Sequence, residues 1–275
     1  MQTKHSVALA LILICIALAT TRSEAQSTLY DNFNGKYIDP SKWLGLEQSY
    51  VTSTRESVRA LTPTPRVSGD KRLQLRQRGY SVITDNTGTS NDSIGLQFAD
   101  PGNITSVSFT EVAETEQAVG CSGNPAAAGV VAGFEGSFFN PSNVNNQAAG
   151  DVKANIVIDQ SSSNTGKSLY AYADYYQCLD AGCSSQNSLF SQALGTVAPG
   201  STNTLTLQWN QSNHQFIFQL NNNPPVASTY TISDSFPPGY PLKYLYAGYF
   251  LPNCTTTPRP YALVDAYFDD VFVNP

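Results

Sequence analysis

Residues 204–220 read TLTLQWNQSNHQFIFQL, and this stretch decides the fold class. Apolar side chains alternate with polar ones from Leu205 to Trp209, which is the period of a β-strand with one buried face. The same alternation returns from Phe216 to Leu220, after the turn-forming run NQSN. The stretch therefore predicts a β-hairpin whose two strands bury the same face.

Similar signals recur along the rest of the chain. Between Lys71 and Tyr80, Leu73 and Leu75 lie on one face and polar side chains on the other, as in a half-buried strand. Because helix-forming stretches are scarce, we predict an all-β fold, an antiparallel two-sheet sandwich. Further strands are expected at 94–98, 106–119, 127–138, 151–159, 168–178, 242–250 and 261–274.

The N-terminus has the layout of a secretory signal peptide. Lys4 precedes an apolar run at 7–19, and the small-residue pattern Ser23-Glu24-Ala25 follows it. We expect cleavage near Ala25, so that residues 1–25 are the signal peptide and the product is secreted, extracellular or periplasmic. Residues 26–275 are predicted to form a single domain without a membrane span, because no other run approaches the roughly 18 apolar residues that a spanning helix needs.

Four cysteines follow the predicted signal peptide: Cys121, Cys178, Cys183 and Cys254. An even number in an oxidising compartment indicates two disulfides, for which three pairings are possible. Cys178 and Cys183 bracket a short LDAG turn and can meet across it, which would leave Cys121 to pair with Cys254. A zinc site is disfavoured, because His214 is the only histidine after the signal and no Cys-x-x-Cys spacing occurs.

Charge limits the classes of partner. The chain carries a formal net charge of −6 and shows no interleaving of aromatic and basic residues, which disfavours nucleic-acid binding. Arginines concentrate between Arg55 and Arg78, where they could form a basic stripe for an acidic glycan or pair with the acidic side chains of the chain. Ion pairing is the expected arrangement. Nothing in the sequence predicts the oligomeric state.

Both ends of the chain carry motifs of a known superfamily. YDNFNG at 30–35 and IDPSKW at 38–43 resemble the first strand and turn of secreted concanavalin A-like lectin/glucanase domains. AYFDDVFV at 266–273 resembles their last strand. The resemblance implies a jelly-roll sandwich. It does not choose an activity, because the superfamily contains lectins, glycoside hydrolases and polysaccharide lyases on one fold.

In the superfamily branch that resembles laminarinases and lichenases, the catalytic carboxylates lie in a short sequence motif. That branch carries Glu-x-Asp-x-(x)-Glu on one strand, and the nearest segment here is FTEVAETE at 109–116. Glu114 and Glu116 are expected to share a strand face, but Glu111 has the opposite parity and the central Asp is absent. The motif is not met, so the sequence disfavours an enzymatic function. An unrelated two-carboxylate arrangement of Glu114 and Glu116 is the alternative.

Tyrosines supply the candidate glycan-binding surface. Flat aromatic rings can bind the C–H faces of sugars, with hydroxyl and amide groups beside them. Tyrosine is also common in strands simply because it packs well there, which is the alternative explanation. The candidate platform consists of Tyr170, Tyr172, Tyr176, Tyr244 and Tyr246, the first three on the same strand face as Asp174.

Asp269 is the candidate metal ligand. Its place in FDDV at 268–271 resembles that of the Asp that holds a structural calcium ion in this superfamily, together with backbone carbonyls near the N-terminus. Alternatively, its carboxylate caps the strand edge or accepts a bond from a backbone amide. We expect that function requires no cofactor.

These observations favour a secreted, non-catalytic domain that binds carbohydrate or another surface. A glycan is the candidate ligand. One alternative is a divergent glycoside hydrolase or polysaccharide lyase that acts at the concave sheet, and another is a purely structural secreted module. The enzyme requires two carboxylates in one groove, about 5 to 10 Å apart. Binding requires exposed, coplanar tyrosines without such a pair, and the structural module requires neither.

Overall fold

A computed structural model describes residues 27–64, 68–162 and 168–274. The predicted signal peptide and its cleavage site lie outside these residues. Within them the regular structure is β-strand, apart from the short 3-10 turn η1 (Gln211–Asn213). No helix in this part of the chain is long and apolar enough to cross a membrane.

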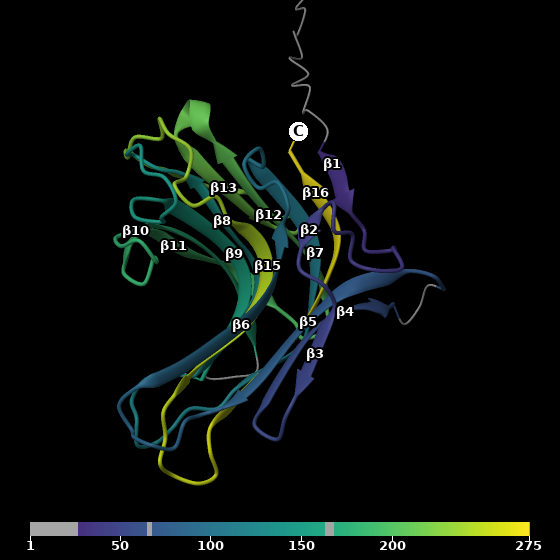
Figure 1. Ribbon diagram of the computed structural model, residues 1–275, viewed down its shortest axis with the longest axis vertical. Helices are drawn as coiled ribbons and strands as arrows, with labels where there is room; N and C mark the ends of the chain where they lie inside the picture. The colour runs from purple at the N-terminus through teal and green to yellow at the C-terminus, as the bar shows by residue number, and fades with distance from the viewer. Residues whose placement is uncertain (1–26, 65–67, 163–167, 275) are drawn as a thin grey trace, which may run out of the picture.

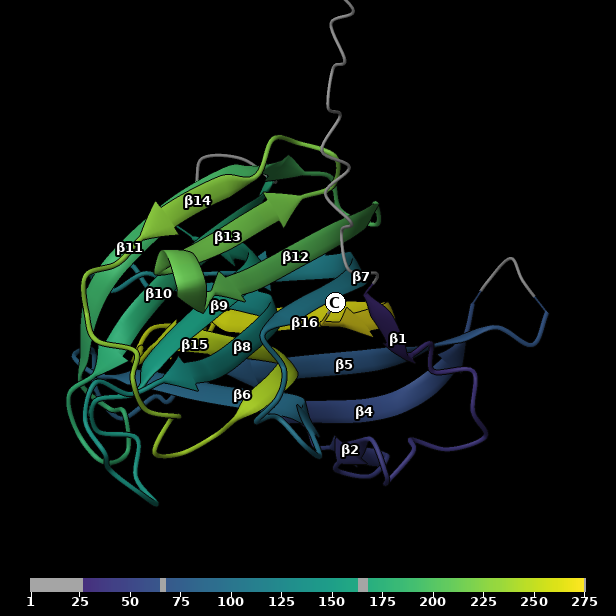
Figure 2. The same ribbon diagram turned by 90° about the horizontal axis from the view of Figure 1, so that it is seen from above.

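The strands form two antiparallel sheets (Figure 1). Figure 2 shows the strands of the first, sheet A, following one another from β14 to β4. In order across the sheet, sheet A contains β14 (Val226–Thr229), β13 (Gln215–Leu220), β12 (Thr202–Asn210), β7 (Ser106–Ala118), β16 (Tyr261–Val273), β5 (Lys71–Tyr80), β4 (Arg55–Pro63) and β3 (Gln48–Val51), with β1 (Thr28–Asp31) beside β16. Sheet B contains β11 (Gln186–Val197), β10 (Leu169–Cys178), β9 (Val152–Ser161), β8 (Gly129–Phe139), β15 (Lys243–Pro252), β6 (Thr89–Phe98) and β2 (Trp43–Leu44).

The predicted all-β fold is confirmed: two antiparallel sheets form a sandwich, which is consistent with a jelly roll. A single large cluster of buried apolar side chains from both sheets fills the space between them. Sheet B is curved, and Figure 1 shows its hollow side facing away from sheet A. Side chains on that hollow side are therefore not needed for the core and are free to serve a ligand.

The predicted hairpin is confirmed: its two strands lie in sheet A and pack against sheet B. Leu207 lies opposite Phe218, and Trp209 lies opposite Phe216, with these apolar side chains on the inner face. Trp209 stacks on Phe139 of sheet B, with ring centroids 5.6 Å apart. The alternating apolar side chains of residues 204–220 are thus the ones that pack against the other sheet.

Both disulfides have the pairing that the short LDAG turn suggested. Cys178 pairs with Cys183, with their Cα atoms 4.7 Å apart, and Cys121 pairs with Cys254 at 5.8 Å. Disulfides persist in oxidising compartments, so the two bridges are consistent with an extracellular protein.

Two arginines of β5, Arg76 and Arg78, form ion pairs on the outer face of sheet A, and the third, Arg72, lies over the ring of Tyr267. Arg76 contacts Glu56 at 3.0 Å and Asp265 at 3.3 Å, and Arg78 contacts Glu56 at 3.5 Å. Arg55 pairs with Asp92. These contacts match the expected ion-paired arrangement.

The expectation that Glu114 and Glu116 share a strand face is wrong. The pairing of β7 with β16 shifts between Ala113 and Thr115, which leaves Glu114 as an extra residue in a β-bulge. As a result Glu114 is exposed, whereas Glu116 points between the sheets, as does Glu111. A bulge of one residue reverses the parity of every side chain beyond it.

Glu111 and Glu116 are buried carboxyl groups without hydrogen-bond partners among the described residues. Burial raises the pKa of both groups well above the usual range, and the charge of Glu111 adds to the effect on Glu116. Each carboxyl is therefore neutral in the folded state at a pH where the unfolded chain has ionised it. Their contribution to stability is complete below the unfolded pKa and is lost as the pH rises toward the folded pKa.

We expect the free energy of unfolding of the double variant Glu111→Gln/Glu116→Gln to fall less between pH 5 and pH 8 than that of the wild type, by at least about 1 kcal/mol. Urea denaturation at both pH values measures this difference. The control is Glu114→Gln, an exposed position on the same strand, which should retain the pH dependence of the wild type. Equal pH dependence in the double variant and the wild type would contradict the assignment.

Candidate functional site

Strand register sets a row of polar side chains across the hollow side of sheet B. Glu135 of β8 lies opposite Asn155 of β9, and Asn155 lies opposite Asp174 of β10. Alternate residues of a strand point to opposite faces, so these three side chains leave the core together. The complete row across six strands is Gln97, Tyr244, Glu135, Asn155, Asp174 and Ser191.

The neighbouring row supplies the floor of a hollow. Tyr246 and Tyr172 stand at its two sides, with Gly133 and Val157 between them. Gly133 has φ +148°, and a Cβ atom there would lie 2.4 Å from the carbonyl oxygen of Ile156. Only glycine is accommodated at that position, so the floor between the two tyrosines stays low.

Two adjoining pockets follow these rows, and we call them together the sheet B groove. The first has a volume of about 420 Å³, and the second, of about 280 Å³, shares Asn155 and Asp174 with it. The first is lined by Glu135, Asn155, Asp174, Tyr176, Gln186, Ser188 and Ser191. The second is lined by Val130, Val131, Asn155, Val157, Asp159, Tyr172, Asp174, Tyr246 and Phe250.

Lys153 and Tyr176 hold Glu135 in the groove. Lys153 Nζ donates to its Oε1 at 2.9 Å, and the hydroxyl of Tyr176 donates to its Oε2 at 3.1 Å. The Glu135 and Lys153 side chains are only 13% and 10% exposed, so the ion pair is largely shielded from water. A shielded, hydrogen-bonded ion pair holds its geometry better than a surface pair.

Asp174 is the second carboxyl of the row. Asn155 Nδ2 donates to its Oδ1 at 3.0 Å. Burial raises the pKa of Asp174 to about 7, with a further contribution from the negative charge of Glu135, while the bond from Asn155 acts in the opposite direction. The carboxyl of Asp174 can therefore gain or lose a proton near neutral pH.

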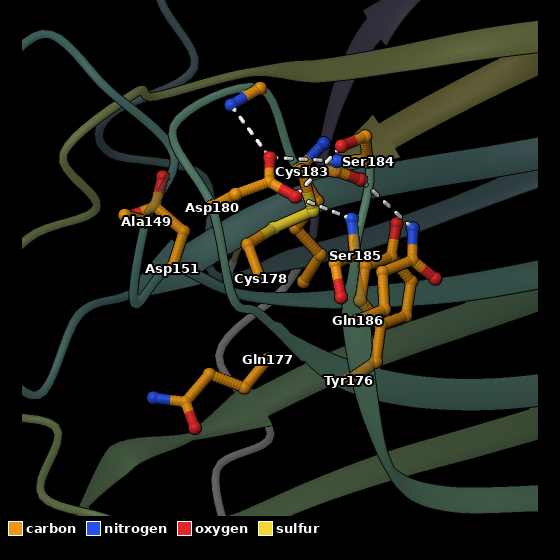
Figure 3. Close-up of a disulfide and its surroundings, with 12 residues drawn as sticks. Ala149, Asp151, Tyr176, Gln177, Cys178, Asp180, Cys183, Ser184, Ser185 and Gln186 are labelled. Carbon is orange, nitrogen blue, oxygen red and sulfur yellow. Dashed lines mark hydrogen bonds between the residues drawn. A yellow bond between two sulfur atoms is a disulfide. The ribbon is translucent and has the colours of Figure 1, made fainter.

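The Cys178–Cys183 loop sets the rim of the groove where β10 leads into β11 (Figure 3). The carboxylate of Asp180 accepts from the backbone N–H groups of Gly182, Ser184 and Ser185. These bonds lower the pKa of Asp180, the contacts with Ser184 having the largest effect. The disulfide and this carboxylate together fix the loop directly before Gln186, which lines the groove.

The five candidate tyrosines come from β10 and β15, two strands of sheet B. Tyr170 and Tyr172 have ring centroids 6.4 Å apart with planes at 54°, and Tyr244 and Tyr246 have centroids 5.2 Å apart with planes at 46°. Tyr176 is 8% exposed and is bonded to Glu135. The rings form two tilted pairs, so the coplanar arrangement expected of a binding surface is not present, and two carboxyl groups, Glu135 and Asp174, line the same groove. The role of the tyrosines in binding stays a prediction.

Sequence reasoning missed Glu135 and the pairing of Glu135 with Asp174. The available signal was GFEGSF at 133–138. In this segment Glu135 directly follows the apolar Phe134 and lies between two glycines. Glu114 and Glu116, the carboxyls chosen from the sequence, lie on β7 in sheet A and do not line the groove. A catalytic role for these two residues stays an untested prediction.

Asp269 is half-buried, and its Oδ1 accepts from the backbone N–H of Asp270 at 2.8 Å. Burial raises the pKa of Asp269 to about 7. The described part of the chain holds no group of three or more His, Cys, Asp or Glu side chains suited to a metal. Apart from Asp269, the predicted calcium site would thus depend on backbone carbonyls, and the ion stays a prediction.

Comparisons with known proteins give remote likenesses of fold. No protein-family model matches the sequence, and no curated protein matches it. Among solved structures, a sialidase has 9% identity over 90% of this chain, with a TM-score of 0.39, and the chain spans 18% of its length. A glycoside hydrolase family 16 endo-glucanase from Bacteroides ovatus has 11% identity over 89% of this chain and 98% of its own, with a TM-score of 0.46.

A laminarinase from Flavobacterium sp. UMI-01 has 9% identity over 87% of this chain and 97% of its own, with a TM-score of 0.42. Likenesses at this level carry no argument about ligand or activity. The case for function therefore depends on the groove itself.

We expect Glu135→Gln to lower the pKa of Asp174, because the substitution removes a negative charge that disfavours ionisation of Asp174. The pKa should remain above its ordinary value, since burial persists. Carboxyl ¹³C chemical shifts followed through a pH titration measure it. The exposed Glu114→Gln variant is the control, and an unchanged Asp174 pKa in Glu135→Gln would show that the two carboxyls are not coupled.

Proposed function

We propose that the protein is a secreted carbohydrate-binding domain and that the sheet B groove holds the glycan. The observation that carries the proposal is the row Glu135, Asn155 and Asp174 beside the glycine-floored hollow between Tyr172 and Tyr246. A sugar presents hydroxyl groups at its edge and C–H groups on its faces. A groove with polar groups in one row and aromatic rings in the next matches both kinds of surface.

The spacing of the tyrosines supports this assignment. Tyr172 and Tyr246 stand on strands three steps apart in sheet B, which places their Cα atoms roughly 14 Å from each other. This span is wide enough for a sugar ring to lie between the two side chains, over Gly133 and Val157. The tilt of the rings favours contact from two sides of the hollow over stacking on one plane.

Carboxylate and amide groups supply the polar contacts. Glu135 and Asp174 accept hydrogen bonds, and sugar hydroxyls donate them. Because Lys153 and Tyr176 hold Glu135, its carboxylate loses little conformational freedom when a ligand binds. The groove is thus preorganised at its polar row.

We expect Tyr172→Ala to weaken binding at least tenfold for any glycan that the wild type binds, because the substitution removes one wall of the hollow. A glycan array identifies the ligand, and isothermal titration calorimetry measures its affinity. Tyr37→Ala is the matched control, since Tyr37 is 65% exposed and does not line the groove. Equal affinities of Tyr172→Ala and the wild type would contradict the location of the site, and silence on the array would contradict the function.

Hydrolysis of the bound glycan is the second candidate function, and the pair Glu135 and Asp174 favours it. Two strand spacings place their Cα atoms roughly 10 Å apart on the same face, and inverting glycosidases hold their two carboxyl groups about 6.5 to 9.5 Å apart. Asp174 would protonate the leaving oxygen, and the Glu135 carboxylate would activate the attacking water.

Product analysis of every glycan that binds separates the two functions. Hydrolysis predicts a new reducing end from the wild type and a rate at least about 100-fold lower in Glu135→Gln and in Asp174→Asn. Binding without a new reducing end in the wild type would exclude hydrolysis of that glycan and leave the binding function standing.

A further inference from the structure

We propose that the half of the sheet B groove between Tyr172 and Tyr246 binds a protonated amino group, so that the glycan it recognises carries an amino sugar. The inference rests on the proposed function and specifies its ligand. It comes from the second pocket, in which two carboxyl groups, Asp159 and Asp174, lie among the rings of Tyr172, Tyr246 and Phe250.

Unpartnered acceptors are the first observation. Asn155 is 9% exposed, and one N–H of its side-chain amide is bonded to Asp174, while its Oδ1 is buried without a hydrogen-bond partner among the described residues. Asp159 Oδ1 is likewise buried and unpartnered. The buried, unpartnered atoms at this place are thus both acceptors, and the group complementary to them is a donor. An ammonium offers three N–H donors and no acceptor.

Uncompensated negative charge is the second observation. The nearby Lys153 forms an ion pair with Glu135, with 2.9 Å between Nζ and Oε1. Among the described residues, neither Asp159 nor Asp174 has an ion-pair partner. Burial raises the pKa of Asp159 to about 6 and of Asp174 to about 7. A bound cation would stabilise both carboxylates, whereas a uronic acid or a sulfated sugar would add repulsion.

Aromatic walls are the third observation. Tyr172 and Tyr246 flank the low floor at Gly133, and Phe250 lines the same pocket. Ring faces attract cations through their quadrupole, and the attraction grows when water is excluded. Carboxylates together with aromatic walls select an ammonium over a hydroxyl at the same position of a sugar ring.

Three tetrasaccharides that differ only at C2 test the inference: β-1,4-linked glucosamine, N-acetylglucosamine and glucose. Calorimetry at pH 6 and low salt, where the sugar amine is protonated, measures their affinities for the full secreted chain. We expect the glucosamine tetramer to bind at least tenfold more tightly than the other two. Equal affinities would overturn the inference and leave the proposed function standing, and failure of the glucosamine tetramer to bind would also overturn it.

Two variants show whether the carboxyls are responsible. Asp159→Asn should weaken binding of the glucosamine tetramer at least fivefold and leave any binding of the glucose tetramer within twofold, whereas Asp174→Asn should weaken binding of the glucosamine tetramer more than binding of the glucose tetramer. Asp270→Asn is the matched control: Asp270 is exposed, and its positive φ of 46° suits asparagine. Thermal unfolding confirms that each variant folds. Equal losses for the charged and neutral tetramers would show that the groove had merely been distorted, and would overturn the inference.

Discussion

The pairing of β8 between β9 and β15 is the constraint on which the rest of the groove depends. In this register Glu135 meets Asn155 on one side and Tyr244 on the other, while Phe134 points into the core. Because side chains alternate along a strand, a slip of one residue would bury the carboxylate and expose the phenylalanine. The apolar core therefore fixes which groups face the ligand.

The shape of the groove depends on the same strand. Gly133 brings the floor close to the backbone of β9, and its φ of +148° admits no side chain without a clash. Glycine weakens a strand interior, and the packing of Phe134 and the hydrogen bonds to both neighbouring strands offset that cost. Because Gly133 has no side chain, a hollow remains between Tyr172 and Tyr246.

Sequence reasoning located the elements with strong alternation and failed where alternation is weak or interrupted. The hairpin at 204–220, the strand from Lys71 to Tyr80 and the Cys178–Cys183 disulfide were predicted from local patterns, whereas the pairing of Cys121 with Cys254 was only what remained. β11 was missed because bulges shift its pairing with β10 and most of its side chains are exposed, which removes the period-two signal. The bulge at Glu114 has no local signature either, so the parity of Glu116 was assigned wrongly. The pair Glu135 and Asp174 arises from cross-strand register, which no single segment of sequence reveals.

The two outer faces of the sandwich differ in whether their charged side chains form ion pairs. On the outer face of sheet A, Arg76 and Arg78 are matched by Glu56 and Asp265. In the sheet B groove, Asp174 has no ion-pair partner among the described residues, so that face retains unused binding capacity.

Backbone amide chemical-shift mapping during titration with the best ligand from the array tests the location of the site most directly. We predict that the largest shifts cluster on β8, β9, β10 and β15, centred on Gly133, Asn155 and Tyr172. Shifts centred on β4, β5 and β16 of sheet A would place the ligand on the opposite face and contradict the account.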